Sequence, residues 1–150
     1  MKIAIDCDSA GLNLKAALLV HIRAAGLDIT DLDYLATHAV DYPDVAVHLA
    51  QQVAAGHYDR GILLCGTGLG VAMSACKVPG IYAATCHDVF SAERARKSNA
   101  AQIITLGERV IGTELAKMVV DAWLRSEFAG GDSERKIRRM HELEKQQNTK

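Results

Sequence analysis

Short apolar runs alternate with stretches of helical periodicity along the whole chain. Five runs have the length and apolar character of buried strands, and they cover residues 2–6, 27–30, 60–64, 81–85 and 102–106. This alternation predicts an α/β protein whose five-stranded parallel sheet is doubly wound, with helices on both faces. Between the runs, apolar residues recur at steps of three and four, in the sets Leu14, Leu18, Ile22 and Ala25; Val45, Leu49 and Val53; and Leu115, Val119, Ala122 and Trp123.

The C-terminal segment has a different pattern. The pair Gly130 and Gly131 is expected to end the preceding helix, and a charged helix resumes over 132–145. Its apolar stripe is too narrow to bury the helix by itself, so we expect the helix to pack on a partner subunit. A solvated basic helix is the open alternative. The stripe consists of Ile137, Met140 and Leu143, and the basic residues are Arg135, Lys136, Arg138 and Arg139.

Composition places the chain among globular proteins. Its 150 residues, 49% hydrophobic and 23% charged, predict a single domain over 1–150, in which about 132–150 form the C-terminal helix and tail. The formal net charge of −1 argues against nucleic acid or an anionic membrane as the main partner. No apolar run approaches the roughly 20 residues that span a bilayer, and the N-terminus enters a strand directly, so we expect a cytoplasmic protein.

The cysteines and histidines show no metal-binding pattern. Cys7, Cys65, Cys76 and Cys86 lie in or beside apolar runs with no CxxC pair, and the six histidines contain no HExxH spacing. In a reducing compartment this pattern indicates free thiols. We expect no metal site.

Three polar clusters stand directly after predicted strands, at residues 6–9, 65–68 and 86–88. Ligands of parallel sheets bind beyond the carboxyl ends of the strands, near the point where the strand order reverses. We therefore expect the three clusters to converge on one crevice. Asp8 and Ser9 also fit a simpler role, that of N-caps for a helix that begins near Gly11.

The second cluster is a glycine-rich turn between a strand and a helix expected from about Leu69. Gly66, Gly68 and Gly70 allow backbone N–H groups to approach an anion closely, and the helix adds its positive end. The turn lacks the Gly-Lys-Ser/Thr ending of a Walker loop. It is nearer to the dinucleotide fingerprint, with Asp88 after the next strand, but its third glycine comes one residue early; nucleotide binding stays an alternative.

Cys65 ends the strand before this turn, a position where a cysteine is usually an inert core residue. Here, however, N–H groups and a helix dipole favour a thiolate, which could act as a nucleophile or as a base. A nucleophile needs an activating histidine, and the sequence does not place His87 or any other histidine beside it. A base needs only a hydroxyl such as that of Thr67 and donors for an oxyanion, which is the equipment of an enediolate-forming isomerase.

The motifs around these residues resemble those of a known family, the sugar-phosphate isomerases that include ribose-5-phosphate isomerase type B and the galactose-6-phosphate isomerase subunits. The resemblance implies a flavodoxin-like or Rossmann-like three-layer α/β/α sandwich and no metal or organic cofactor. It also implies a homodimer with active sites shared across the interface, which could pair into tetramers. From Met1 to about Leu143, the motifs are Cys7-Asp8-x-x-Gly11, Asp41-Tyr42-Pro43, Cys65-Gly66-Thr67-Gly68-x-Gly70, Lys77, Ser91-Ala92, Asn99, Gly107-x-Arg109-Val110-Ile111-Gly112 and Ala116-Lys117.

The resemblance further implies a role for each matching residue. Cys65 is the base that moves a proton between C1 and C2, and Thr67 assists proton exchange at the oxygens. The glycine turn and Asn99 hold the enediolate, Asp8 contacts the sugar hydroxyls, and Tyr42 lines the pocket. The expected substrate contacts are Asp8, Ser9, Tyr42, Gly66, Gly68, Gly70, Asn99, Arg109, Arg135 and Lys136.

The chain departs from the family pattern at four positions. Ser9 and Ser98 stand where the pentose isomerases have a phosphate-binding and a ring-opening histidine, and Asp132 and Lys136 stand where they have phosphate-binding arginines. A pentose 5-phosphate closes a furanose ring through O4, whereas O4 of a tetrose 4-phosphate is esterified and closes no such ring. Residues 8–11 and 98–104 accordingly resemble the branch that isomerises D-erythrulose 4-phosphate.

The leading prediction is therefore reversible isomerisation of D-erythrulose 4-phosphate and D-erythrose 4-phosphate. Ribose 5-phosphate and ribulose 5-phosphate are the alternative pair. An alternative of another class is a non-catalytic sugar-phosphate-binding protein or the partner subunit of a heteromeric isomerase.

Overall fold

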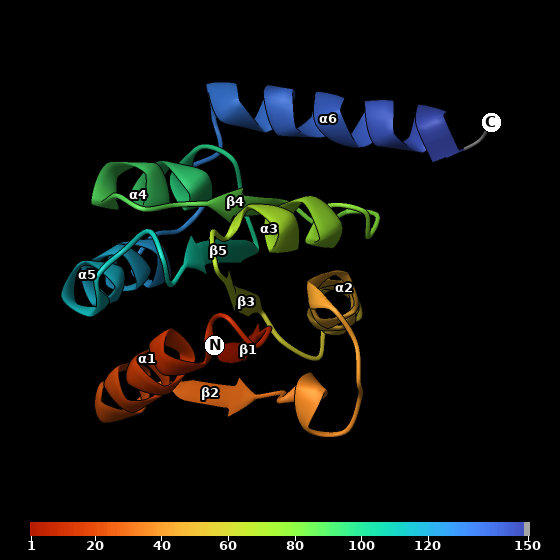
Figure 1. Ribbon diagram of the computed structural model, residues 1–150. Coiled ribbons are helices and arrows are strands. Elements are labelled where there is room, and N and C mark those ends of the chain that lie inside the picture. Colours follow the sequence, from red (N-terminus) through yellow and green to blue (C-terminus); the bar gives the residue numbers. More distant parts are fainter. Residues whose placement is uncertain (149–150) are drawn as a thin grey trace.

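The computed structural model describes residues 1–148, which contain one sheet of five parallel strands. The strand order is β2-β1-β3-β5-β4, so the chain reverses its direction of travel across the sheet between β1 and β3 (Figure 1). All five predicted strands are present close to their expected bounds. They are β1 (Lys2–Cys7), β2 (Asp28–Asp31), β3 (Arg60–Cys65), β4 (Ala83–Thr85) and β5 (Ile103–Gly107).

Helices cover both faces of this sheet, which confirms the predicted three-layer α/β/α sandwich. One face packs against α1 (Leu12–Ala24), α4 (Val89–Lys97) and α5 (Thr113–Leu124). The other packs against α2 (Tyr42–Ala54), which follows a short 3₁₀ turn at Tyr34–Ala36, and against α3 (Leu69–Ala75). The expected helical periods all fall within α1, α2 and α5, apart from Ala25, which caps the end of α1.

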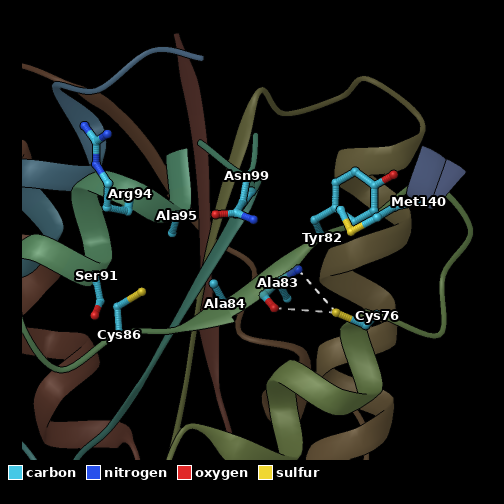
Figure 2. A pocket seen from close by; sticks show the side chains of 11 residues that line it. Cys76, Tyr82, Ala83, Ala84, Cys86, Ser91, Arg94, Ala95, Asn99 and Met140 are labelled. Atoms are coloured by element: carbon cyan, nitrogen blue, oxygen red, sulfur yellow. Dashed lines mark hydrogen bonds between the residues drawn. The ribbon is translucent and has the colours of Figure 1, made fainter. Parts of the chain in front are cut away.

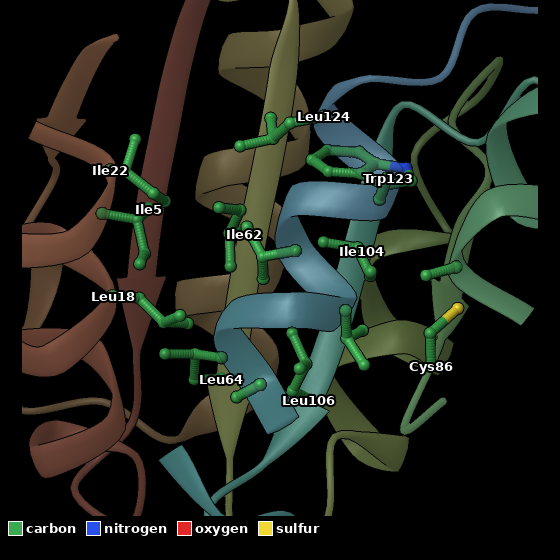
Figure 3. Close-up of a cluster of buried hydrophobic side chains, with 14 of the residues drawn as sticks. Ile5, Leu18, Ile22, Ile62, Leu64, Cys86, Ile104, Leu106, Trp123 and Leu124 are labelled. Carbon is green, nitrogen blue, oxygen red and sulfur yellow. The ribbon is translucent and has the colours of Figure 1, made fainter. Parts of the chain in front are cut away.

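The larger of the two apolar cores lies between the sheet and helices α1 and α5 (Figure 3). Ile5, Ile62 and Ile104 come from three adjacent strands and pack against Leu18 and Trp123, all completely buried. Complete burial of such a side chain stabilises the fold by about 1.5–3 kcal/mol. The strand ends that follow this core are therefore held on a rigid platform.

Helix α5 ends earlier than its sequence suggested. It stops at Leu124, six residues before Gly130, so the expectation that the glycine pair ends it was wrong. Arg60 explains the position, because its buried guanidinium donates to the carbonyls of Trp123, Leu124 and Ser126 at 2.7, 3.0 and 2.7 Å. These carbonyls are among those that a helix end leaves without an intrahelical donor.

Helix α6 (Asp132–Asn148) lies outside the sandwich, along the side formed by α4, β4 and α3 (Figure 1). None of its described residues is buried, and Met140 and Leu143 are 39% and 42% exposed. Its contacts with the body include a hydrogen bond from the Gly80 N–H to the Glu144 carboxylate at 2.9 Å and a His141 Nδ1 that lies 3.1 Å from the Tyr82 hydroxyl. Packing on a partner subunit stays a prediction, and residues 149 and 150 of the expected tail lie outside the described residues.

Candidate active site

A cavity of about 400 Å³ opens at the carboxyl ends of β1 and β3, the point where the strand order reverses. The two ends are adjacent because Cys7 pairs with Leu64 in the sheet and the Asp8 N–H donates to the Leu64 carbonyl at 3.2 Å. Parallel α/β sheets bind ligands at this position. The cavity is lined by Asp8, Ser9, Ala10, Tyr42, Cys65, Gly66, Thr67, Gly70 and Arg109.

Cys65 lies at the centre of the glycine turn. Its side chain is 5% exposed, and its Sγ accepts the Gly68 N–H at 3.0 Å, so the turn is folded around the sulfur. The Thr67 side chain is exposed on the rim, where its Oγ1 accepts the Leu69 N–H at 3.3 Å. Within residues 1–148, the N–H groups of Gly66 and Thr67 donate to no protein group. These two, rather than the N–H of Gly68, are the free donors for a bound oxyanion.

The glycines of the turn are required by close packing. Gly68 has a φ of +78°, and a Cβ there would lie 2.8 Å from the backbone carbon of Leu106. A Cβ on Gly70 would lie 2.5 Å from the Tyr42 ring, and one on Gly66 would lie 3.2 Å from Arg109 Nη1. The two side chains that form walls of the cavity, Tyr42 and Arg109, therefore rest directly on glycine backbone.

Two threonines support the turn from below. Thr105 is completely buried in β5 and pairs with Thr85 of β4 in the sheet. Both hydroxyls lie against the Gly68 carbonyl, Thr105 Oγ1 at 2.7 Å and Thr85 Oγ1 at 3.1 Å. Sequence reasoning missed this pair, although a threonine within each of two apolar strands, at the end of β4 and in the middle of β5, was the available signal.

Asp8 and Ser9 are not helix caps. The N-cap position of α1 is Gly11, which makes no side-chain cap, and Asp8 Oδ1 instead accepts the Ala10 N–H at 2.9 Å. The simpler interpretation of the first cluster was therefore wrong for both residues. Both line the cavity.

Glu108 caps α1 from the loop after β5. Its carboxylate accepts the Leu14 N–H at 3.0 Å and the Asn13 side-chain amide at 2.9 Å. The hydrogen bond from Leu14 N–H is the main cause that lowers the pKa of Glu108. The cap ties α1 to the same loop that carries Arg109, so two walls of the cavity are joined.

Cys7, at the end of β1, differs from Cys65 in its surroundings. Burial raises the pKa of the Cys7 thiol to about 12, against the opposing effect of Lys15. Lys15 is itself buried, with Nζ 2.9 Å from an Asp31 oxygen and 3.9 Å from one of Asp6. Burial also raises the pKa of Asp6, whose carboxylate accepts the Cys7 N–H at 2.8 Å. The contacts of Lys15 with Asp31 and Asp6 hold the end of β1, which precedes Asp8. Cys7 therefore has a structural role.

Three expected substrate contacts lie elsewhere in the chain. Asn99 lines a second cavity, of about 430 Å³, on its wall between Arg94 and Tyr82 (Figure 2). Arg135 and Lys136 are exposed on α6. Within one chain, eight expected site residues line one cavity, whereas Gly68 is buried in the same turn without lining it, and Asn99, Arg135 and Lys136 do not line it. The eight are Asp8, Ser9, Tyr42, Cys65, Gly66, Thr67, Gly70 and Arg109.

The three residues of the third polar cluster lie in three different places, so the expectation that this cluster joins the same crevice was wrong. Cys86 lines the second cavity, whereas His87 reaches the back of the glycine turn, where its Nε2 accepts the Gly107 N–H at 2.9 Å. Asp88 caps α4 by accepting the Ser91 N–H at 2.7 Å. Helix α4 shows no apolar period in the sequence because its buried residues are two alanines, Ala92 and Ala95.

Two further searches cover the described residues 1–148. No group of three or more His, Cys, Asp or Glu side chains there is arranged to hold a metal ion. None of the helices in this part of the chain combines the length and apolar character needed to cross a membrane.

Comparisons with known proteins cover nearly the whole chain. The sequence model of a family described as Ribose/Galactose Isomerase matches residues 3–140. D-erythrulose-4-phosphate isomerase of Pectobacterium atrosepticum is 50% identical over 148 residues, covering 98% of this chain and 97% of the relative. Ribose-5-P isomerase B of Listeria innocua is 47% identical over 144 residues, covering 96% and 97%. The structure of Clostridium thermocellum ribose-5-phosphate isomerase B has a TM-score of 0.92 at 42% identity, covering 97% of this chain and 99% of that one.

Proposed function

The chain belongs to the ribose/galactose isomerase family, and from this premise we propose that its preferred substrate pair is D-erythrulose 4-phosphate and D-erythrose 4-phosphate. The family resemblance found in the sequence is confirmed, and with it the class of enzyme, an aldose–ketose isomerase acting on a phosphosugar. We propose, in addition, which residues carry out the reaction and which sugar is the substrate.

The observation that carries the proposed chemistry is the position of Cys65. Its sulfur already accepts a backbone N–H, beside a rim hydroxyl and the free N–H groups of Gly66 and Thr67. Cys65 removes the proton from C2 of the aldose and returns it to C1, and the Thr67 hydroxyl carries the proton between O1 and O2. The free N–H groups stabilise the negative charge that develops on the enediolate.

The charged and polar walls of the cavity suit the rest of the substrate. Asp8 and Ser9 offer acceptors and a hydroxyl for the sugar's own hydroxyl groups, and Tyr42 closes the side. Among the described residues that line the cavity, Arg109 is the cation, and it lies against Gly66, next to the reacting carbons. We assign Arg109 to the charge of the enediolate. The phosphate then needs other cations.

These cations and Asn99 are assigned to a second copy of the chain. Arg135 and Lys136 lie on a helix with no buried residue, and Asn99 lines a cavity that includes Met140 of the same helix. In a homodimer with two-fold symmetry, one such surface on each protomer can complete the other's site. We place this dimer in the cytoplasm.

The tetrose assignment rests on Ser9 and Ser98. Neither serine can serve as an acid or base for opening a furanose ring at neutral pH, and a tetrose 4-phosphate has no such ring to open. The 50% identical relative is named a D-erythrulose-4-phosphate isomerase, which supports the assignment. The 47% identical relative is named a ribose-5-P isomerase B, which keeps the pentose pair as the second candidate.

Steady-state assays of the purified chain on both pairs test the proposal. We expect kcat/KM to be at least about tenfold higher on D-erythrulose 4-phosphate than on ribose 5-phosphate, a difference of about 1.4 kcal/mol in transition-state binding. A higher kcat/KM on ribose 5-phosphate would contradict the tetrose assignment. No turnover of either sugar by the chain alone would favour a non-catalytic or partner subunit.

A further inference from the structure

The imidazole of His87 lies behind the glycine turn and has no role in the chemistry described so far. It follows β4, is partly buried, and its Nε2 accepts the Gly107 N–H at 2.9 Å. Gly107 is the last residue of β5 and pairs with Cys65 in the sheet. His87 therefore holds the one peptide that lies directly opposite the cysteine.

The Gly107 peptide is in direct contact with the turn. A Cβ on Gly107 would lie 2.4 Å from the carbonyl carbon of Thr67, and one on Gly68 would lie 3.1 Å from Gly107 N. The next two N–H groups along the chain, those of Glu108 and Arg109, donate to the carbonyls of Cys65 and Gly66 at 2.9 and 3.0 Å. The Gly107 backbone is thus packed against Thr67 and Gly68, so a rotation of this peptide would displace the turn.

We propose that His87 is a positioning residue, whose neutral imidazole holds the Thr67–Gly68 turn in the conformation needed for isomerisation. Protonation of His87 breaks its hydrogen bond with the Gly107 N–H, frees the turn and lowers turnover in acid. Nε2 accepts an N–H only through its lone pair, so the active tautomer carries its proton on Nδ1. A second proton would turn Nε2 into a donor facing the Gly107 N–H. The inference rests on the proposed role of the turn in the reaction.

The charged and titratable groups around His87 leave it neutral at pH 7. Burial lowers the pKa of His87, and Asp88 opposes that effect. Cys86, on its other side, is uncharged because burial raises the pKa of its thiol to about 11. Across the Gly107 peptide, Glu108 is engaged with Leu14 and Asn13, and β5 contributes only the Thr105 hydroxyl.

The direction of the pH effect follows from these causes. Because the folded-state pKa of His87 is lowered, the hydrogen bond is fully present above the ordinary value of about 6.5. It is lost as the pH falls through the lower, folded-state value. Turnover should decline in that lower range in addition to any decline caused by ionisation of the substrate phosphate.

The test compares His87→Gln and His87→Leu with wild type, by kcat at saturating substrate between pH 5 and 8. Glutamine offers an acceptor oxygen near the position of Nε2 at every pH, whereas leucine offers none. We expect H87L to lose at least about fivefold in kcat at pH 8, and H87Q to recover most of that loss and to lack the acid decline due to His87. His57→Gln is the matched control, since His57 is exposed and bonded to Gln52 at the opposite end of the strands.

Each outcome decides the inference separately from the proposed function. An H87Q enzyme with the acid decline of wild type, or an H87L enzyme with wild-type kcat at pH 8, overturns it. If the wild-type chain turns over no phosphosugar, the proposed function fails, and amide hydrogen exchange still tests the linkage. We expect the Gly107 and Gly68 amides to exchange faster in H87L than in H57Q, with other β5 amides unchanged; equal rates overturn the role of His87.

Discussion

Two buried cysteines end adjacent strands, and their neighbours give them opposite chemistry. Cys7 is surrounded by apolar side chains and carboxylates, and burial raises the pKa of its thiol to about 12. Cys65 lies in a cavity wall, and a backbone N–H donates to its sulfur. Of the two, only Cys65 combines access to a small molecule with a polar contact that orients the sulfur. The base is therefore assigned by surroundings and not by residue type.

This assignment predicts the effect of removing each thiol. Cys65→Ala should lower kcat by about 10²- to 10⁴-fold, the usual contribution of a general base, with little change in the unfolding midpoint. Cys7→Ala is the matched control, because Cys7 is a buried structural residue that does not line the Cys65 cavity, and it should retain wild-type kcat. Steady-state kinetics and thermal melts measure both effects. An active Cys65→Ala enzyme would exclude the thiol as base.

The close packing of Gly68 predicts a second difference between two similar positions. Gly68 and Gly56 have φ values of +78° and +77°, but only at Gly68 would a Cβ meet other atoms within 4 Å. Gly56→Ala should cost only the backbone strain, about 1–2 kcal/mol, and retain wild-type kcat. Gly68→Ala should cost more and also lower kcat at least about tenfold, because the turn must move away from Leu106. Urea unfolding and kinetics on both variants check this, and equal effects would contradict the packing argument.

At the scale of helices and strands, the sequence predicted what apolar side chains determine and missed what polar contacts determine. The five strands and helices α1, α2 and α5 were found because large apolar residues recur at their periods. Helix α4 was hidden because it buries only Ala92 and Ala95. The end of α5 could not be predicted because Arg60, which stops it, lies 63 residues away from Trp123 in the chain. No local signal marks such a contact.

Arg60 should accordingly be a main determinant of stability at the end of α5. Replacement by methionine preserves the apolar stem but leaves the carbonyls of Leu124 and Ser126 without their donor, whereas the Trp123 carbonyl keeps the Ser126 N–H. We expect the free energy of unfolding to fall by about 2 kcal/mol or more, since each of the two unsatisfied carbonyls costs about 1–3 kcal/mol. Arg125→Met is the control, because the Arg125 side chain is 74% exposed, and should change it by about 0.5 kcal/mol or less. Similar urea midpoints for the two variants would contradict this role.

The cap that Glu108 provides for α1 predicts a dependence of stability on pH. Hydrogen bonds from Leu14 and Asn13 lower the pKa of Glu108 in the folded state. Its contribution is therefore complete above the ordinary value of about 4.3 and is lost as the pH falls through the folded-state value. The difference in unfolding free energy between wild type and Glu108→Gln should shrink as the pH falls from 6 to 3. Glu134→Gln, on the exposed face of α6, should show no such change; a constant difference for Glu108→Gln would rule out the cap as the cause.

For the whole molecule, the sequence predicted where the site lies better than it predicted which residues form the site. Strand ends at the reversal point had to meet, so the grouping of Asp8, Ser9 and Cys65 followed from topology alone. The expected convergence of the third cluster was wrong because β4, which leads into it, lies at the sheet edge, with β5 between it and β3. Asn99, which the family resemblance implied as a substrate contact, follows the next helix and lines the second cavity. Glu108 was missed because it acts on a backbone N–H of a distant helix, and Thr85 and Thr105 were missed because a threonine in an apolar strand does not show which backbone carbonyl it contacts.

The separation of Asn99 from Cys65 leads to a prediction that only an assembly of two chains can fulfil. If Asn99 acts in the partner's site, the variants Cys65→Ser and Asn99→Ala should each be inactive alone and regain activity when mixed under conditions that exchange subunits. Each mixed dimer then carries one site with both residues intact and one site with neither, so random mixing should restore about a quarter of wild-type turnover.

A mixture of Cys65→Ser with Thr67→Ala is the control, because both residues line the same cavity of one chain and no mixed dimer contains an intact site. Kinetics before and after exchange measure the recovery. Absence of recovery, with subunit exchange demonstrated by mass-tagged chains, would place Asn99 outside the partner's site and leave the enediolate to the donors of the Cys65 turn alone.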